Sequence, residues 1–134
     1  MANRVPFDDR GNENISIDDI SPLLLKDYLT KIDSRLAKAN FATDIETILD
    51  QMQLYDGPKE KRIIKNVAAM MFSEHPEKFF PTTQVDIVVF PKGREVDPEN
   101  FIEVPPIKGP VPMMIRNSLE YLRTNIIKER ITKP

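Results

Sequence analysis

The chain has 134 residues and a formal net charge of −2, so we expect a single domain. It contains no cysteine and one histidine, His75, which excludes disulfides, cysteine nucleophiles and Cys/His zinc sites within these residues. A hydrophobic share of 40% with so small a net charge excludes a disordered polyelectrolyte, and no apolar run approaches the roughly 18 residues of a membrane span. Residues 1–10 lack the apolar core of a signal peptide, so we expect a cytoplasmic protein without a membrane partner.

The first part of the chain predicts an extended segment followed by a helix. Residues 1–14 read as an extended leading segment that ends in turn residues. Ser21 is a good N-cap in front of Pro22, which suits the first position of a helix. Apolar residues at helical spacing then predict an amphipathic helix that ends around residues 37–40.

A second helix is expected after a capping box formed by Thr43 and Glu46, and Asp56-Gly57-Pro58 is expected to stop it. The nearly all-apolar run within Lys59–Ser73 is ambiguous, because periodicity alone does not separate a buried helix from a central strand. Alanine and methionine in this run favour a helix, which we expect from about Lys65.

The middle of the chain predicts strands and turns, since eight of the twelve prolines lie between Pro76 and Pro112 and proline blocks helix interiors. The segment Val85–Phe90 is short, β-branched and bounded by turn residues, which indicates a strand. A turn in which Gly93 can adopt positive φ leads to a second, antiparallel strand over Phe101–Val104.

A last helix follows these strands and ends in basic residues. Its apolar stripe has the spacing i, i+4, i+7 and i+11 and consists of Ile115, Leu119, Leu122 and Ile126. Helices at both ends with strands between them predict the α+β class, with three or four helices packed on a small antiparallel sheet.

The candidate functional residues are few. Without a nucleophile or ligand cluster around His75, we expect no catalytic, cofactor-binding or metal-binding residue and therefore no enzyme. Basic residues in two places could contact a nucleic-acid backbone, although no aromatic residues are interleaved with them. These cations are Lys59, Lys61, Arg62, Lys65, Lys92 and Arg94.

The order of several motifs resembles a bacterial family. The motifs are Arg4–Arg10, Asp56-Gly57-Pro58, the run Asn66–Pro81 (its most specific part), the strand Val85–Phe90 and Lys108-Gly109-Pro110. Nearly the whole chain is similar to the central region of bacterial transcriptional regulators that are often labelled RecG-related ATP-dependent DNA helicases. In that family an Alba-type (Schlafen-like) DNA-binding domain precedes this region and a histidine-kinase-like ATP-binding domain follows it.

The resemblance implies that residues 1–134 are a single central connector domain and a fragment of a longer protein. Its partners would be the flanking domains, with DNA and ATP bound by those domains and no cofactor held here. Two alternatives remain open, which are direct nucleic-acid binding through the six cations and oligomerisation as a homodimer through the stripe of the last helix.

Overall fold

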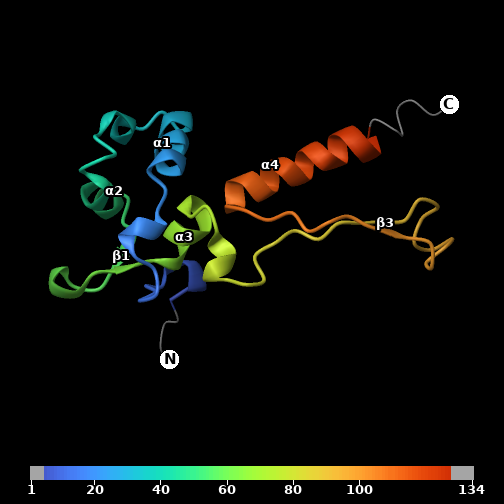
Figure 1. Cartoon of the computed structure of the whole chain (residues 1–134), viewed down its shortest axis with the longest axis horizontal. Coiled ribbons are helices and arrows are strands. Elements are labelled where there is room, and N and C mark those ends of the chain that lie inside the picture. The colour runs from blue at the N-terminus through green and yellow to red at the C-terminus, as the bar shows by residue number, and fades with distance from the viewer. Residues whose placement is uncertain (1–4, 128–134) are drawn as a thin grey trace.

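The structure is a computed structural model that describes residues 5–127 (Figure 1). In this part of the chain, four α-helices and two antiparallel strand pairs confirm the α+β class that the sequence predicts. The strands form two separate two-stranded sheets, β1–β2 and β3–β4. Helices α1 to α3 and β1–β2 make up a body, while β3–β4 and α4 project from it as an arm.

Helix α1 (Pro22–Lys31) begins as predicted, because the Ser21 hydroxyl accepts a hydrogen bond from the Leu24 N–H at 3.2 Å. The prediction that it ends at residues 37–40 is wrong. Asp33 adopts a left-handed φ of 56°, and the Ser34 N–H donates to the Leu29 carbonyl at 2.9 Å, which is a Schellman ending. The apolar residues beyond it lie instead in a separate 3₁₀ turn, η3 (Arg35–Lys38).

Helix α2 (Ile45–Gln51) also departs from the predicted caps. Its N-cap is Asp44 and makes no side-chain cap bond, so the capping box expected from Thr43 is wrong. It ends before Asp56-Gly57-Pro58, because Gln53 adopts a φ of 61° and the Leu54 N–H donates to the Leu49 carbonyl at 2.9 Å. Both helices therefore end on a left-handed residue that is not glycine.

The strands β1 (Tyr55–Asp56) and β2 (Ile63–Ile64) flank a turn that contains the 3₁₀ segment η4 (Lys59–Lys61). Gly57 has a φ of +86°, and a Cβ there would lie 2.6 Å from the Lys61 carbonyl oxygen, so only glycine fits. The ambiguous run that follows is resolved in favour of a helix, α3 (Asn66–Phe72). Its start near Lys65 is confirmed.

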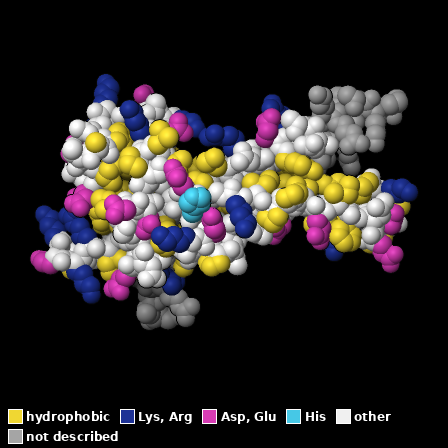
Figure 2. Space-filling view, viewed as in Figure 1, with side chains coloured by type: hydrophobic (Ala, Val, Ile, Leu, Met, Phe, Trp, Pro, Cys, Tyr) yellow, Lys and Arg dark blue, Asp and Glu magenta, His cyan; other side chains and the backbone are white. Residues whose placement is uncertain are grey.

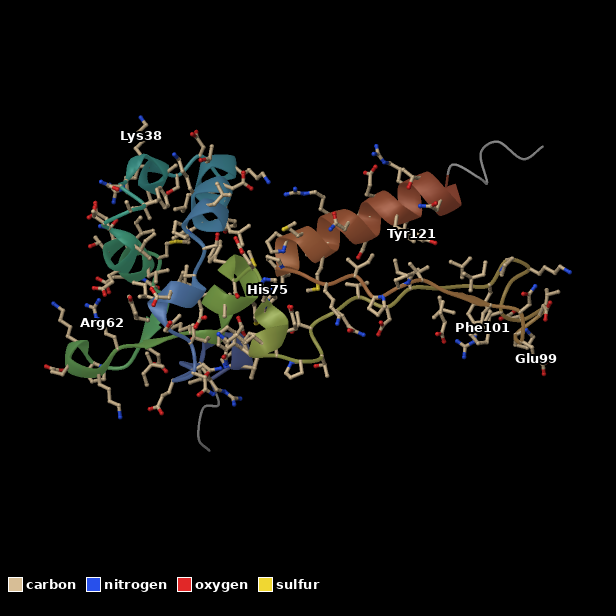
Figure 3. All side chains as sticks on the ribbon, in the orientation of Figure 1. Lys38, Arg62, His75, Glu99, Phe101 and Tyr121 are labelled. Atoms are coloured by element: carbon tan, nitrogen blue, oxygen red, sulfur yellow. The ribbon has the colours of Figure 1, made fainter. Side chains whose placement is uncertain are left out.

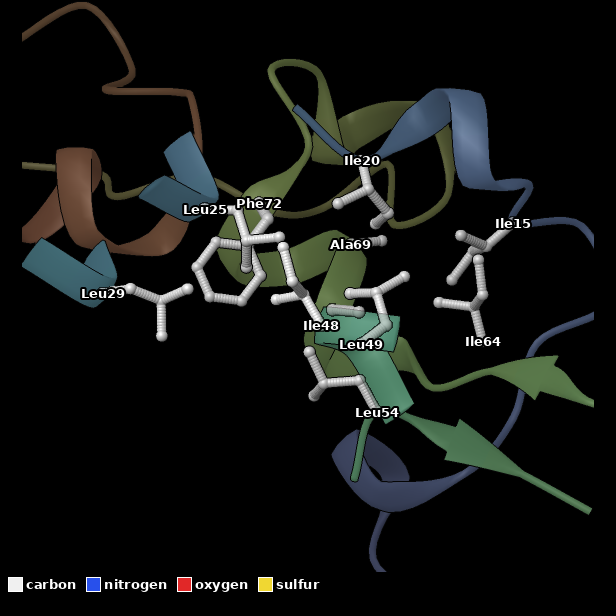
Figure 4. Packing of buried hydrophobic residues seen from close by; sticks show 11 residues of the cluster. Ile15, Ile20, Leu25, Leu29, Ile48, Leu49, Leu54, Ile64, Ala69 and Phe72 are labelled. Atoms are coloured by element: carbon white, nitrogen blue, oxygen red, sulfur yellow. The ribbon is translucent and has the colours of Figure 1, made fainter. Parts of the chain in front are cut away.

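The hydrophobic core belongs to the body. Buried side chains from α1, α2 and α3 pack around Ala68, Ala69 and Phe72 of α3 (Figure 4). The Phe72 ring meets Tyr28 of α1 edge to face, with ring centroids 5.4 Å apart. The cluster of buried core residues starts at Ile15 and ends at Phe72, and Phe79 and Phe80 pack against its edge.

The leading segment is held to α3 by polar contacts. It turns through a 3₁₀ segment, η1 (Phe7–Asp9), rather than remaining extended throughout. The buried Asn66 amide donates to the Phe7 carbonyl at 2.8 Å and accepts from the Asn12 amide at 3.0 Å. A second 3₁₀ turn, η2 (Ile17–Asp19), leads into α1. The segment is thus tied to the first turn of α3 at two points.

The arm begins after the short 3₁₀ turn η5 (Pro76–Lys78). Strands β3 (Val88–Val89) and β4 (Ile102–Glu103) are antiparallel, as predicted, but shorter than the predicted ranges. Helix α4 (Val111–Tyr121) packs on α3 near its start and continues as a π-helical segment, η6 (Leu122–Ile127). No helix in residues 5–127 is long and apolar enough to cross a membrane.

Candidate functional site

The six cations expected to contact nucleic acid lie in two groups at opposite ends of the molecule. Four of them belong to the β1–β2 end of the body, where Figure 3 labels Arg62, and the other two follow β3 in the arm. The first group is Lys59, Lys61, Arg62 and Lys65, and the second is Lys92 and Arg94. The structure therefore does not bring the six cations onto one surface.

Carboxylates accompany most of the first group. The Lys65 ammonium lies 2.6 Å from the Asp9 carboxylate and its side chain is 16% exposed, so it ties the leading segment to the start of α3. Arg62 lies 3.2 Å from Asp50, and a looser contact of 3.9 Å joins Lys61 to Glu13. Because each carboxylate offsets the charge of its cation, this end of the body attracts phosphate less strongly than the sequence suggests.

An open groove of about 490 Å³ lies beside Arg62. The Arg62 guanidinium covers the Tyr55 ring at 5.3 Å, and isoleucines from η2 and β2 form part of the wall. Burial raises the pKa of Tyr55, and the nearby Glu46 carboxylate raises it further. The groove can hold an apolar group next to the Arg62 guanidinium. Acidic and basic side chains both line it, so it does not select one class of ligand.

Lys92 and Arg94 lie at the exposed tip of the β3–β4 hairpin. Gly93 between them has a φ of +88°, as the predicted turn requires, and its N–H donates to the Phe90 carbonyl at 2.9 Å. Three carboxylates follow within the same loop, which are Glu95, Asp97 and Glu99. The tip thus carries more acidic than basic charge.

His75 sits at the surface between α3 and η5. Its side chain is 77% exposed, and Nδ1 lies 3.4 Å from a Glu77 carboxylate oxygen. The hydroxyl of Ser73 accepts a hydrogen bond from the His75 backbone N–H. The Ser73 hydroxyl is therefore bound to the backbone of this turn rather than to the imidazole. Within residues 5–127, no group of three or more histidine, aspartate or glutamate side chains could hold a metal ion.

Exposed apolar side chains gather on the arm. Seven of the eleven exposed large apolar residues in the described chain lie between Val88 and Leu119, although the core cluster contains none of this segment. Figure 2 shows hydrophobic side chains as a band along the arm. We call this the arm surface and define it as Val88, Phe101, Ile115 and Leu119. Ile102 lies on the other face of the hairpin, and Met113 lines a small pocket with Tyr28 of α1.

The arm surface has two parts that the local geometry sets. Because Val88 pairs with Glu103, those two side chains share a face of the hairpin with Phe101, whose ring lies 5.9 Å from that of Phe90. On α4, Ile115 and Leu119 are 55% and 61% exposed. The side of the helix that is covered is centred on Met114, which is 7% exposed.

No protein-family model, curated protein or solved structure matches the chain. Residues 5–127 contain open grooves with mixed charges, two separated groups of cations and an uncovered apolar surface on the arm. Of these, the arm surface gathers exposed apolar side chains, and a patch of this kind often marks contact with another protein.

The hairpin half of the arm surface was missed by sequence reasoning. The run from Val85 to Phe90 is apolar at five of six positions, which is a signal for a strand covered on both faces. A two-stranded hairpin alone cannot supply that cover. The sequence predicted the apolar stripe of the last helix. The structure adds that Ile115 and Leu119 of this stripe are exposed. The side chain of Ile126 lies outside what the structure describes.

Proposed function

We propose that this chain is the non-catalytic central domain of a cytoplasmic transcriptional regulator, whose DNA-binding and ATP-binding domains lie outside these residues. The observation that carries the proposal is the division between a body with its own core and an arm that exposes apolar surface. Such a chain acts by contact with other protein rather than by chemistry at a site.

The shape supports a connector. Phe7 is fixed to the body through the Asn66 amide, and α4 leads away from the body along the arm (Figure 1). The 11 residues of α4 alone span about 16 Å. A domain joined ahead of Phe7 and another joined beyond η6 would therefore be held apart at a set distance, and the last helix would lead toward the ATP-binding domain.

The test is the intact mass of the native gene product, followed by binding assays on that product and on this chain. We expect a product well above the 15.4 kDa of these residues, which binds duplex DNA and ATP while the 134-residue chain binds neither. A native product that ends at Pro134 would contradict the connector role.

The same assays decide the rival function, which is direct nucleic-acid binding. If the chain itself binds duplex DNA, its affinity must fall with added salt, with a slope that follows the number of phosphates contacted. Replacing Lys59 and Lys61 by glutamine would then reduce that slope, whereas the same change at Lys92 and Arg94 tests the other group. We expect no affinity at low salt, because the two groups lie far apart and carboxylates accompany both.

A further inference from the structure

The arm surface can form the apolar centre of an interface. Its four side chains are between 47% and 61% exposed. Four side chains of this size, each about half exposed, offer on the order of 300 Å², which lies within the range of the largest apolar patch of typical monomers. Polar residues around this patch would supply the rest of the roughly 800 Å² that each partner contributes to a standard interface.

The two halves of the arm surface carry opposite charge. The hairpin segment 85–107 has five carboxylates and two cations, for a net charge of −3. The segment 111–127 has two arginines and one glutamate, for a net charge of +1. Glu103 lies on the same hairpin face as Val88, while Arg116 follows Ile115 on the helix. Arg123 pairs with Glu120 on the same helix at 2.7 Å, so Arg116 supplies the positive charge that complements the acidic hairpin.

The halves do not cover each other within the chain. Val88 and Phe101 remain 47% and 48% exposed, and Leu119 on the helix remains 61% exposed. The first turn of α4 packs beside Tyr28 and Phe72 of the body, which fixes where the helix starts. The link between hairpin and helix contains Pro105, Pro106 and Pro110, whose restricted φ angles limit how far the two can fold together.

We propose that a second copy of this chain covers the arm surface, with α4 of each copy lying on the β3–β4 hairpin of the other about a twofold axis. In this arrangement the same pair of surfaces meets twice, as a closed dimer requires. Ile115 and Leu119 of one copy cover Val88 and Phe101 of its partner, and Arg116 lies near the partner's Glu103. The hairpin then gains the packing against a helix that an isolated pair of strands lacks.

The dimer does not depend on the connector role. The connector role is tested by the mass and binding of the native product, whereas the dimer is tested by the mass of this chain in solution. Either can fail alone. If both hold, the regulator presents its flanking domains in pairs.

The first test is sedimentation velocity of the full chain from about 1 μM to about 1 mM, a range that includes the dissociation constants of weak dimers. We expect reversible dimerisation, and Leu119→Glu should raise the dissociation constant about tenfold or more. The matched control is Leu23→Glu, because Leu23 is 74% exposed on α1, outside the arm. It should leave the constant within about twofold. A monomer throughout the range, or equal effects of the two variants, would overturn the proposal.

The second test exchanges charges and identifies which surfaces meet. Arg116→Glu and Glu103→Arg should each weaken the dimer, and the two together should restore it toward the original dissociation constant. Both side chains belong to exposed positions, so the circular dichroism of each variant should match that of the parent chain. A double variant that is weaker than either single variant would overturn the helix-on-hairpin arrangement.

Discussion

At the scale of single residues, loops of the body are held by a few polar side chains with several partners each. Asp19 is the clearest case. Its carboxylate accepts a hydrogen bond from the Ser16 N–H at 2.8 Å, and its other oxygen lies 3.3 Å from the Lys78 ammonium. These contacts join the turn before α1 to the turn after α3. The Ser16 hydrogen bond, with help from Lys78, holds the pKa of Asp19 below its ordinary value of 3.8.

That lowered pKa predicts a specific acid response. Because the pKa of Asp19 is lower in the folded than in the unfolded chain, its stabilisation is complete well above pH 3.8 and is lost as the pH falls below that value and through the native pKa. The free energy of unfolding of Asp19→Asn, measured by urea titration, should therefore fall short of the parent value at pH 7 and approach it in acid. Asp18→Asn, at the exposed neighbouring carboxylate, should show a much smaller difference at pH 7. A gap for Asp19→Asn that stays constant down to pH 2 would contradict this assignment.

At the scale of elements, the ends of α1 and α2 share one device. Each helix closes on a residue with left-handed φ that is not glycine, Asp33 at 56° and Gln53 at 61°. The backbone hydrogen bonds of the Schellman motif satisfy carbonyls at the end of the helix, and this outweighs the strain at Cβ. The strain remains in the native chain and can be removed by substitution.

Two glutamine-to-glycine variants on the same helix end should therefore have opposite effects. Gln53→Gly removes the strain and should raise the free energy of unfolding by about 0.5–1 kcal/mol. Gln51→Gly, at the last residue of α2, adds only backbone freedom and should lower it by about 0.5–1 kcal/mol. Thermal or urea unfolding of the two variants beside the parent measures both, and a loss of stability in both would show that Gln53 is not strained.

At the scale of the whole molecule, stability and surface belong to different parts of the chain. Within residues 5–127, the core cluster is formed by the body, whereas Met114 of the arm is 7% exposed and lies outside that cluster. The body should therefore fold as the cooperative unit. The loss of unfolding free energy on substitution should depend on where the residue lies rather than on its type.

Leucine-to-alanine substitutions offer the direct measurement. Leu49 is fully buried between the helices, so Leu49→Ala should cost about 2–5 kcal/mol of unfolding free energy. Leu23 is 74% exposed on the first turn of α1, and Leu23→Ala should change stability by less than about 0.5 kcal/mol. Chemical denaturation followed by circular dichroism gives both values. Similar losses at the two positions would mean that the core is not where the structure places it.

Sequence reasoning predicted those parts of the fold that local chemistry decides. The Ser21 cap, the positive φ of Gly93 and the antiparallel pairing of Val88–Val89 with Ile102–Glu103 all follow from short-range rules. The helix ends were missed because the rules look for glycine at the left-handed position, and here Asp33 and Gln53 occupy it. The hydrogen bonds that close these ends join backbone groups, so no side-chain type in the sequence marks them.

The candidate site was less predictable for a related reason. Neither the separation of Lys59 from Lys92 nor the pairing of Lys65 with Asp9 is written in their spacing along the chain. An apolar stripe at helical spacing predicts that one face of α4 is covered, but not by what. The exposure of Ile115 and Leu119 required the arrangement of all the elements.

The ending of the core cluster at Phe72 has a thermodynamic consequence. For a single copy, the heat capacity and denaturant dependence of unfolding scale with the surface that the body buries, and the body is about half of the 134 residues. A domain of about 60 residues buries only about 60% of the surface of its unfolded chain, so its margin of stability is narrow. A change worth 1 kcal/mol, such as the loss of one contact of Asn66 or Asp19, is then a large part of what keeps a single copy folded.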